Sequence, residues 1–172
     1  MSNFFKVHTD TLGRLEACIK KSMYGISQKA FTDELPSSLR NIKEGDIIYI
    51  SEKEVSNNAL FGPFYVIDSS KRPEIIFKGK FGSWIEIDVK RTPRDQRAYW
   101  VEFDSFTHCI LFDKTLSAEL SIVWPKDWYN LGLELPSWGE IPRSEAEKLM
   151  KFANKNTEEA RDFFKRHNLF FF

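Results

Sequence analysis

The stretch from Ile42 to Ile50 reads Ile-Lys-Glu-Gly-Asp-Ile-Ile-Tyr-Ile and joins a polar turn to a run of mostly β-branched residues. Glycine and aspartate favour turns, whereas isoleucine and tyrosine favour strands, so a strand is expected to begin at Ile47. Its apolar residues follow one another without polar interruption, which is typical of a buried strand. The stretch therefore predicts a turn that leads directly into the core.

A strand and a helix are expected before this stretch. Residues Phe4 to His8 predict an opening strand, and Thr9-Asp10 offers a helix N-cap. Apolar residues then recur at helical spacing between Leu12 and Met23. Tyr24-Gly25 is expected to end that helix, because glycine readily adopts the left-handed conformation of a C-terminal cap. Residues 26–38 have little periodicity and predict a loop or a short helix.

More strands are expected after this stretch. Residues 60–67 predict an edge strand or a bulged strand, because Pro63 has no N–H to donate to a central ladder. Further strand candidates lie at residues 84–89, 99–101 and 109–112, which gives about six strands in all.

The pattern changes after Trp124-Pro125, where loops and helices replace strands, with helices expected from Ser144 and from Thr157. A strand, a helix and then closely spaced strands without further β–α alternation predict the α+β class, as a small, partly closed barrel flanked by helices. The length of 172 residues fits one domain. We expect this domain at residues 1–155, followed by a C-terminal helical extension or linker at 156–172.

The two cysteines and the hydropathy pattern bear on cofactors and location. Cys18 and Cys109 lie in apolar stretches without a second cysteine at zinc-site spacing, so both are expected to be buried free thiols, and no metal or cofactor is predicted. The chain has no apolar run of about 20 residues and no secretory signal pattern at its start, so a cytoplasmic location is expected.

Candidate catalytic groups are few. The three histidines are His8, His108 and His167, and no nucleophile-elbow, phosphate-loop or dinucleotide pattern accompanies them. Glu86 and Asp88 share one face of an expected strand, but no histidine supports them. The sequence therefore predicts a protein that is not an enzyme.

Positive charge and aromatic rings concentrate between residues 71 and 97. The formal net charge of the chain is zero, yet this segment carries eight basic residues against four acidic ones, whereas residues 101–147 carry three against nine. Aromatic rings stack on bases while lysine and arginine hold the backbone, so the segment predicts binding of an unstacked base. Alternatively, its charges are ordinary solvated groups and its aromatic residues belong to the core. The residues expected to hold phosphates are Lys78, Lys80, Arg91 and Arg94.

Several motifs in the first half of the chain follow one another in a defined order. The opening strand and helix lead to Tyr24-Gly25-Ile26-Ser27, and the turn and strand at 42–50 come next. They are followed by Phe61-Gly62-Pro63-Phe64-Tyr65-Val66 and by Phe81-Gly82-Ser83-Trp84-Ile85-Glu86-Ile87. This order resembles EVE and YTH domains of the PUA-like superfamily, over about residues 3–91. The resemblance implies a PUA-like β-barrel.

Such domains read RNA or modified bases by enclosing one base in an aromatic pocket, so the resemblance implies a comparable pocket here. Ile26 stands where YTH domains place the first tryptophan of that pocket, which leaves methyl selectivity open. Ser27 matches the polar residue that follows this tryptophan. The implied pocket residues are Thr9, Asp10, Tyr24, Ile26, Ser27, Phe77, Phe81 and Trp84.

The expected function is that of a non-catalytic module that accommodates a flipped or unstacked base of DNA or RNA, methylated or unmodified. Similar domains lie at the N-terminus of McrBC-type modification-dependent restriction proteins, which implies a fused or associated NTPase or nuclease. Two alternatives stay open. One is a protein-interaction module that docks through the acidic C-terminal half and the Phe-rich tail, and the other is an enzyme acting on RNA or a small ligand in the same pocket.

Overall fold

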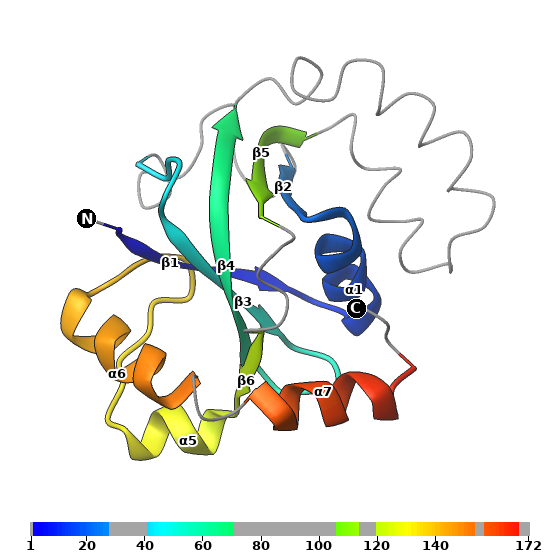
Figure 1. The fold of residues 1–172 in the computed structure, drawn as a ribbon, viewed down its shortest axis with the longest axis vertical. Helices are drawn as coiled ribbons and strands as arrows, with labels where there is room; N and C mark the ends of the chain where they lie inside the picture. Colours follow the sequence, from blue (N-terminus) through cyan, green and yellow to red (C-terminus); the bar gives the residue numbers. More distant parts are fainter. Residues whose placement is uncertain (1, 28–40, 71–105, 114–119, 154–156, 169–172) are drawn as a thin grey trace.

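The computed structural model describes residues 2–27, 41–70, 106–113, 120–153 and 157–168. Within these ranges, seven strands form one sheet and four helices pack around it (Figure 1). The strands are β1 (Phe4–Thr9), β2 (Met23–Ser27), β3 (Ile47–Glu52), β4 (Ala59–Ser70), β5 (Phe106–Phe112), β6 (Ser121–Val123) and β7 (Gly139–Ile141). The helices are α1 (Leu12–Lys21), α5 (Pro125–Asn130), α6 (Arg143–Ala153) and α7 (Thr157–Arg166).

The strands follow the order β2-β5-β4-β3-β1-β7, and β6 pairs with β4 beside this path. β1 and β3 run parallel, and every other described pair is antiparallel. The α+β class is confirmed. The described sheet is open, however, because β2 and β7 form its two ends and no described pairing joins them.

β3 is the predicted buried strand, and all six of its residues are buried. Successive side chains point to opposite faces of a strand. Ile48 and Ile50 accordingly pack into the larger core cluster, whereas Ile47 and Tyr49 pack into a second cluster. The continuous apolar run is therefore explained by a strand with protein on both faces.

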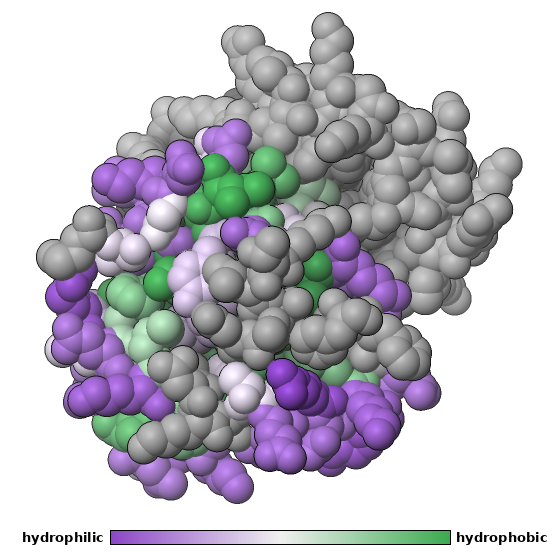
Figure 2. Space-filling view, in the orientation of Figure 1, coloured by the Kyte–Doolittle hydropathy of each residue, from purple (hydrophilic) through white to green (hydrophobic). Residues whose placement is uncertain are grey.

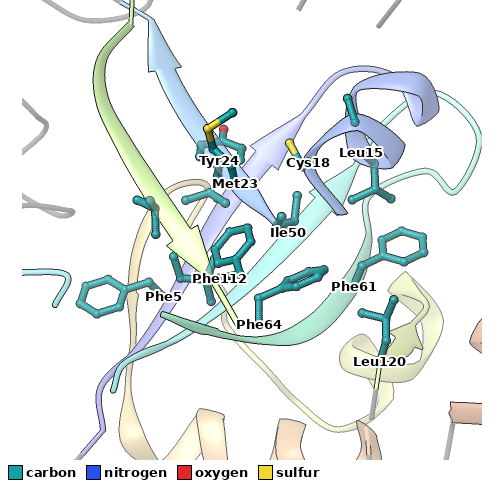
Figure 3. Packing of buried hydrophobic residues seen from close by; sticks show 14 of the residues in the cluster. Phe5, Leu15, Cys18, Met23, Tyr24, Ile50, Phe61, Phe64, Phe112 and Leu120 are labelled. Atoms are coloured by element: carbon teal, nitrogen blue, oxygen red, sulfur yellow. The ribbon is translucent and has the colours of Figure 1, made fainter. Parts of the chain in front are cut away.

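Helices cover both faces of the sheet. The larger cluster receives Leu15 and Cys18 from α1 and two phenylalanines from α7 (Figures 1 and 3). The second cluster receives Ala146 and Leu149 from α6, with Trp128 of α5 packed against it. In the view of Figure 2, hydrophilic residues form most of the outer rim of the described part, so the apolar faces of the helices turn inward.

Of the two predicted alternatives around Pro63, an edge strand or a bulged strand, the second is confirmed. β4 lies in the middle of the sheet, with β3 on one side and with β5 and β6 on the other. β5 pairs with β4 from Val66 onward and β6 pairs with it up to Gly62, while the register with β3 shifts opposite the same point. The Gly62-Pro63 peptide bond is cis. A central strand thus accommodates proline because the described ladders are interrupted on both sides of it.

The boundaries of α1 differ from those expected. The N-cap is Thr11, whose side chain accepts a hydrogen bond from the Arg14 N–H, rather than Thr9-Asp10. The helix ends at Ser22, which adopts the left-handed conformation with a φ of 53°. Tyr24-Gly25 does not close the helix, because both residues lie in β2, a strand that the sequence pattern did not reveal.

The C-terminal segment expected as an extension packs into the core through α7. Phe164 stacks on Phe61 with 5.6 Å between ring centroids, and Phe163 contacts both of these rings. Both α7 phenylalanines are buried. Cys18 and Cys109 are buried and are not joined in a disulfide, as expected. Among the described helices, none is long and apolar enough to span a membrane.

We predict that no side chain fits at Gly62 of β4 without a loss of stability. A Cβ added there would lie 2.6 Å from Tyr49 Cδ1 and 3.1 Å from the Ile48 carbonyl oxygen. We expect Gly62→Ala to lower the free energy of unfolding by about 1–3 kcal/mol, measured by urea denaturation. The penalty should shrink in a Tyr49→Val background, and an equal penalty in both backgrounds would contradict this contact.

Phe164→Ala is predicted to destabilise the whole domain rather than to release α7 alone. Phe164 is 1% exposed, and removal of a buried phenylalanine ring costs about 3–5 kcal/mol. Arg166→Ala, an exposed change on the same helix, is the control and should have little effect. A loss below about 1 kcal/mol for Phe164→Ala in urea denaturation would show that the core does not need α7.

Candidate functional site

The predicted site residues are distributed over described and undescribed parts of the chain. Seven of them lie outside the described residues. These are Phe77, Lys78, Lys80, Phe81, Trp84, Arg91 and Arg94. Their segment begins after Ser70, the last residue of β4, whereas the first residue of β4, Ala59, lies at the opposite end of this long strand (Figure 1).

Two of the predicted pocket residues, Thr9 and Tyr24, come together at the carboxyl end of β1. The Tyr24 hydroxyl donates a hydrogen bond to the His8 carbonyl, and the Thr9 hydroxyl donates to the Ser51 carbonyl. Both side chains are buried, and burial raises the pKa of Tyr24 well above its usual range. Tyr24 and Thr9 therefore brace the end of β1 from inside the protein instead of lining an open pocket.

The other predicted pocket residues have different surroundings. Asp10 is exposed, and its carboxylate lies 3.0 Å from His8 Nε2 and 3.8 Å from Arg14 Nη1. Ile26 and Ser27 are the last residues of β2, opposite His108 and Phe106 of β5. Phe77, Phe81 and Trp84 lie outside the described residues, so the arrangement of all eight around one base stays a prediction.

The structure instead shows a groove beside Tyr24 and Asp10, which we call the indole groove. It has a volume of about 430 Å³ and combines two indole rings with two lysines and one imidazole. A pocket of about 300–1,000 Å³ suits a small molecule or a single nucleotide. The residues that line it are Lys6, His8, Lys53, Asn58, Trp128, Leu135, Pro136, Ser137 and Trp138.

Four segments build the indole groove. Lys6 and His8 project from β1 on the face opposite the buried Phe5 and Val7, following the strand alternation. The β3–β4 turn, residues 53–58, contributes Lys53 and Asn58, and the remaining walls come from α5 and from the segment before β7. Residues far apart in the sequence thus meet because β1 and β3 run parallel and end at the same place.

Direct contacts hold these walls together. The Lys6 ammonium donates a hydrogen bond to the Ser137 carbonyl at 2.9 Å, which ties β1 to the segment before β7. Burial lowers the pKa of Lys6. Trp138 packs edge-on against Tyr24, with 5.9 Å between ring centroids, so the predicted pocket residue Tyr24 supports the groove from behind.

His8 belongs to a row of three side chains, an acid, a histidine and a serine, which has the composition of a nucleophilic triad. Its Nδ1 lies 2.9 Å from Ser51 Oγ, and its Nε2 lies 3.0 Å from Asp10 Oδ1. Ser51 is 0% exposed, so its hydroxyl cannot reach a substrate in this arrangement. The contacts of His8 with Ser51 and Asp10 instead fix the orientation of its imidazole in the wall of the groove.

The charge of the indole groove favours an anion. None of its described lining residues is acidic, and Lys6 and Lys53 supply two ammonium groups. The nearby Asp10 carboxylate is already in contact with His8 and Arg14. Indole faces and ammonium groups together suit a flat ring that carries a phosphate.

The β3–β4 turn is held rigidly by Glu52, a fully buried carboxylate. Its oxygens accept hydrogen bonds from the Val55 and Ser56 N–H groups and from the Ser56 hydroxyl, at 2.7–3.2 Å. The Asn58 N–H donates to the Glu52 carbonyl at 2.7 Å. A buried carboxylate with this many donors fixes the turn that forms one wall of the groove.

Sequence reasoning missed the main residues of the indole groove. The alternation of Lys6 and His8 with buried apolar residues in β1 was one available signal. Another was the presence of three of the five tryptophans between residues 124 and 138. The acidic excess of the same region, however, does not indicate phosphate binding. Within the described ranges, no three metal-ligating side chains cluster in a way that could hold a metal ion.

Comparison with protein-family models, with curated proteins and with solved structures finds no match for this chain. The resemblance to EVE and YTH domains therefore stays a prediction.

Glu52→Ala is predicted to loosen the β3–β4 turn. The substitution leaves the part-buried Val55 N–H and the buried Ser56 N–H without their acceptor, which costs about 1–3 kcal/mol. Hydrogen exchange at these two amides should become faster, while Glu54→Ala, an exposed carboxylate change in the same turn, should leave exchange unchanged. Unchanged exchange in Glu52→Ala would mean that the turn is held by other contacts.

Proposed function

We propose that this chain is a non-catalytic nucleic-acid-binding module that accepts an unstacked base in the indole groove. One observation carries the proposal: two tryptophans, two lysines and a histidine line a groove of about 430 Å³, and no carboxylate is among the lining residues that the structure describes. Nucleic-acid recognition needs both elements of this arrangement, since aromatic faces stack on bases and cations hold phosphates.

The size of the indole groove supports recognition of one base. A volume of about 430 Å³ admits a base with part of its sugar, so the base must leave its stack to enter. Stacking on an aromatic side chain contributes about 1–3 kcal/mol per base, and two rings are present. Lys53, which is exposed at the rim, is placed to meet the phosphate that accompanies this base.

The PUA-like barrel is part of the proposal. The described sheet supports only the coarser α+β class, and the basic segment at 71–97 lies outside the described residues. Its predicted contacts, Lys78, Lys80, Arg91 and Arg94, would add phosphate binding beyond the groove. Association with an NTPase or nuclease also rests on the sequence resemblance alone.

Salt-dependent binding tests the proposed function. The full chain should bind a fluorescein-labelled single-stranded oligonucleotide in anisotropy titrations at low salt, and the affinity should fall as salt rises, because phosphate contacts release counterions. Methylated and unmodified DNA and RNA form the arms of the titration. An absence of binding to all of them at low salt would refute the proposal.

Two variants locate the binding in the indole groove. Lys53→Ala should weaken binding and flatten the salt dependence, whereas Lys165→Ala, which removes the same charge from exposed α7, should not. Trp138→Ala should lose about 1–3 kcal/mol of binding free energy, and Trp138→Phe should recover part of it. Circular dichroism checks the fold of the tryptophan variants, because Trp138 also contacts Tyr24.

A further inference from the structure

A second pocket lies on the other side of the β3–β4 turn. Its volume is about 470 Å³, and the turn residues that line it are different from those that line the indole groove. Lys53 and Asn58 belong to the indole groove, while Val55, Ser56 and Asn57 belong to the second pocket. The remaining lining residues are Trp124, Pro125, Lys126 and Glu159. One short turn therefore separates two hollows.

Helix α5 backs both hollows. Its N-cap residue Trp124 and its first turn line the second pocket, and Trp128, one turn further along, lines the indole groove. Helix α5 therefore contributes one tryptophan to each hollow, Trp124 to the second pocket and Trp128 to the indole groove, and the turn at residues 53–58 contributes to both. Two hollows built on the same helix and the same turn suit an extended ligand.

The dividing turn has the properties of a wedge. Hydrogen bonds to the buried Glu52 carboxylate hold the turn in place, and Val55 presents an apolar side chain that is 41% exposed. Asn57 and Asn58 both adopt positive φ angles, 53° and 70°, which turn the chain sharply back into β4. Proteins that unstack bases commonly insert an aliphatic side chain between neighbouring bases.

We infer that the ligand is a single strand of at least two nucleotides, whose adjacent bases enter the two hollows on either side of the β3–β4 turn, with Val55 between them. This inference rests on the proposed function and specifies its ligand. An unpaired strand can splay two successive bases, whereas a duplex would first have to break its base pairs.

The charges of the two hollows divide the roles within this ligand. The described lining of the second pocket includes one cation, Lys126, and one carboxylate, Glu159, whose Oε1 accepts a hydrogen bond from the Trp124 indole at 2.6 Å. These opposite charges balance, which suits an uncharged base. The described lining of the indole groove includes cations and no acidic residue, so the phosphate between the two bases falls on the side of Lys53.

Length dependence tests the inference. Unlabelled thymidine mononucleotide, dinucleotide and tetranucleotide, in DNA and RNA form, compete with a labelled oligonucleotide for the full-length chain. The dinucleotide should bind about tenfold more tightly than the mononucleotide, because a second base gains a binding site. Val55→Ala and Lys126→Ala should reduce this gain.

Tyr129→Ala is the matched control, since Tyr129 is 78% exposed on α5 but lines neither hollow. It should leave the length dependence unchanged. Equal affinity for mononucleotide and dinucleotide in the unmodified chain would overturn the two-base inference while leaving a one-base site intact. If no oligonucleotide binds the protein, either directly or in competition with the labelled one, the proposed function itself is wrong.

Discussion

The burial of β3 on both faces is the constraint on which the rest of this structure depends. An isolated sheet can bury one face against helices and leave the other in water. Here Ile48 and Ile50 require cover on one side, and Ile47 and Tyr49 require it on the other. The chain therefore needs helices on both faces, and α7 and α6, which come last in the sequence, supply that cover.

The same strand positions the candidate site. Because β3 runs parallel to β1, the two strands end together, and His8 lies beside Ser51 while Thr9 lies beside Glu52. Glu52 is the last residue of β3, and its buried carboxylate fixes the turn that follows. Hydrogen bonds to the Glu52 side chain thus anchor the β3–β4 turn, which lies at the surface, to the core. A wall fixed in this way costs little to order when a ligand binds.

Local patterns predicted the local structure well, and failed where distant segments meet. The apolar run at 47–50 predicted a buried strand, and the helical spacing at 12–23 predicted a helix, because both depend on side chains close in sequence. The strand at 23–27 was missed because its only described partner is β5, some 80 residues away. At Pro63 the sequence left an edge strand and a bulged strand open, because no local rule shows that β5 and β6 would pair with β4 on either side of it.

The candidate site could be predicted from the sequence only in part for the same reason. Thr9, Asp10 and Tyr24 do lie at the end of β1, but two of them are buried, and the open walls come from α5 and the segment before β7. Counted along the sequence, residues 101–147 have an excess of acidic side chains. Ligands instead respond to the side chains that share a surface, and none of the described residues that line the indole groove is acidic. A chain of zero net charge can therefore present a cationic, aromatic groove when its fold separates the two signs.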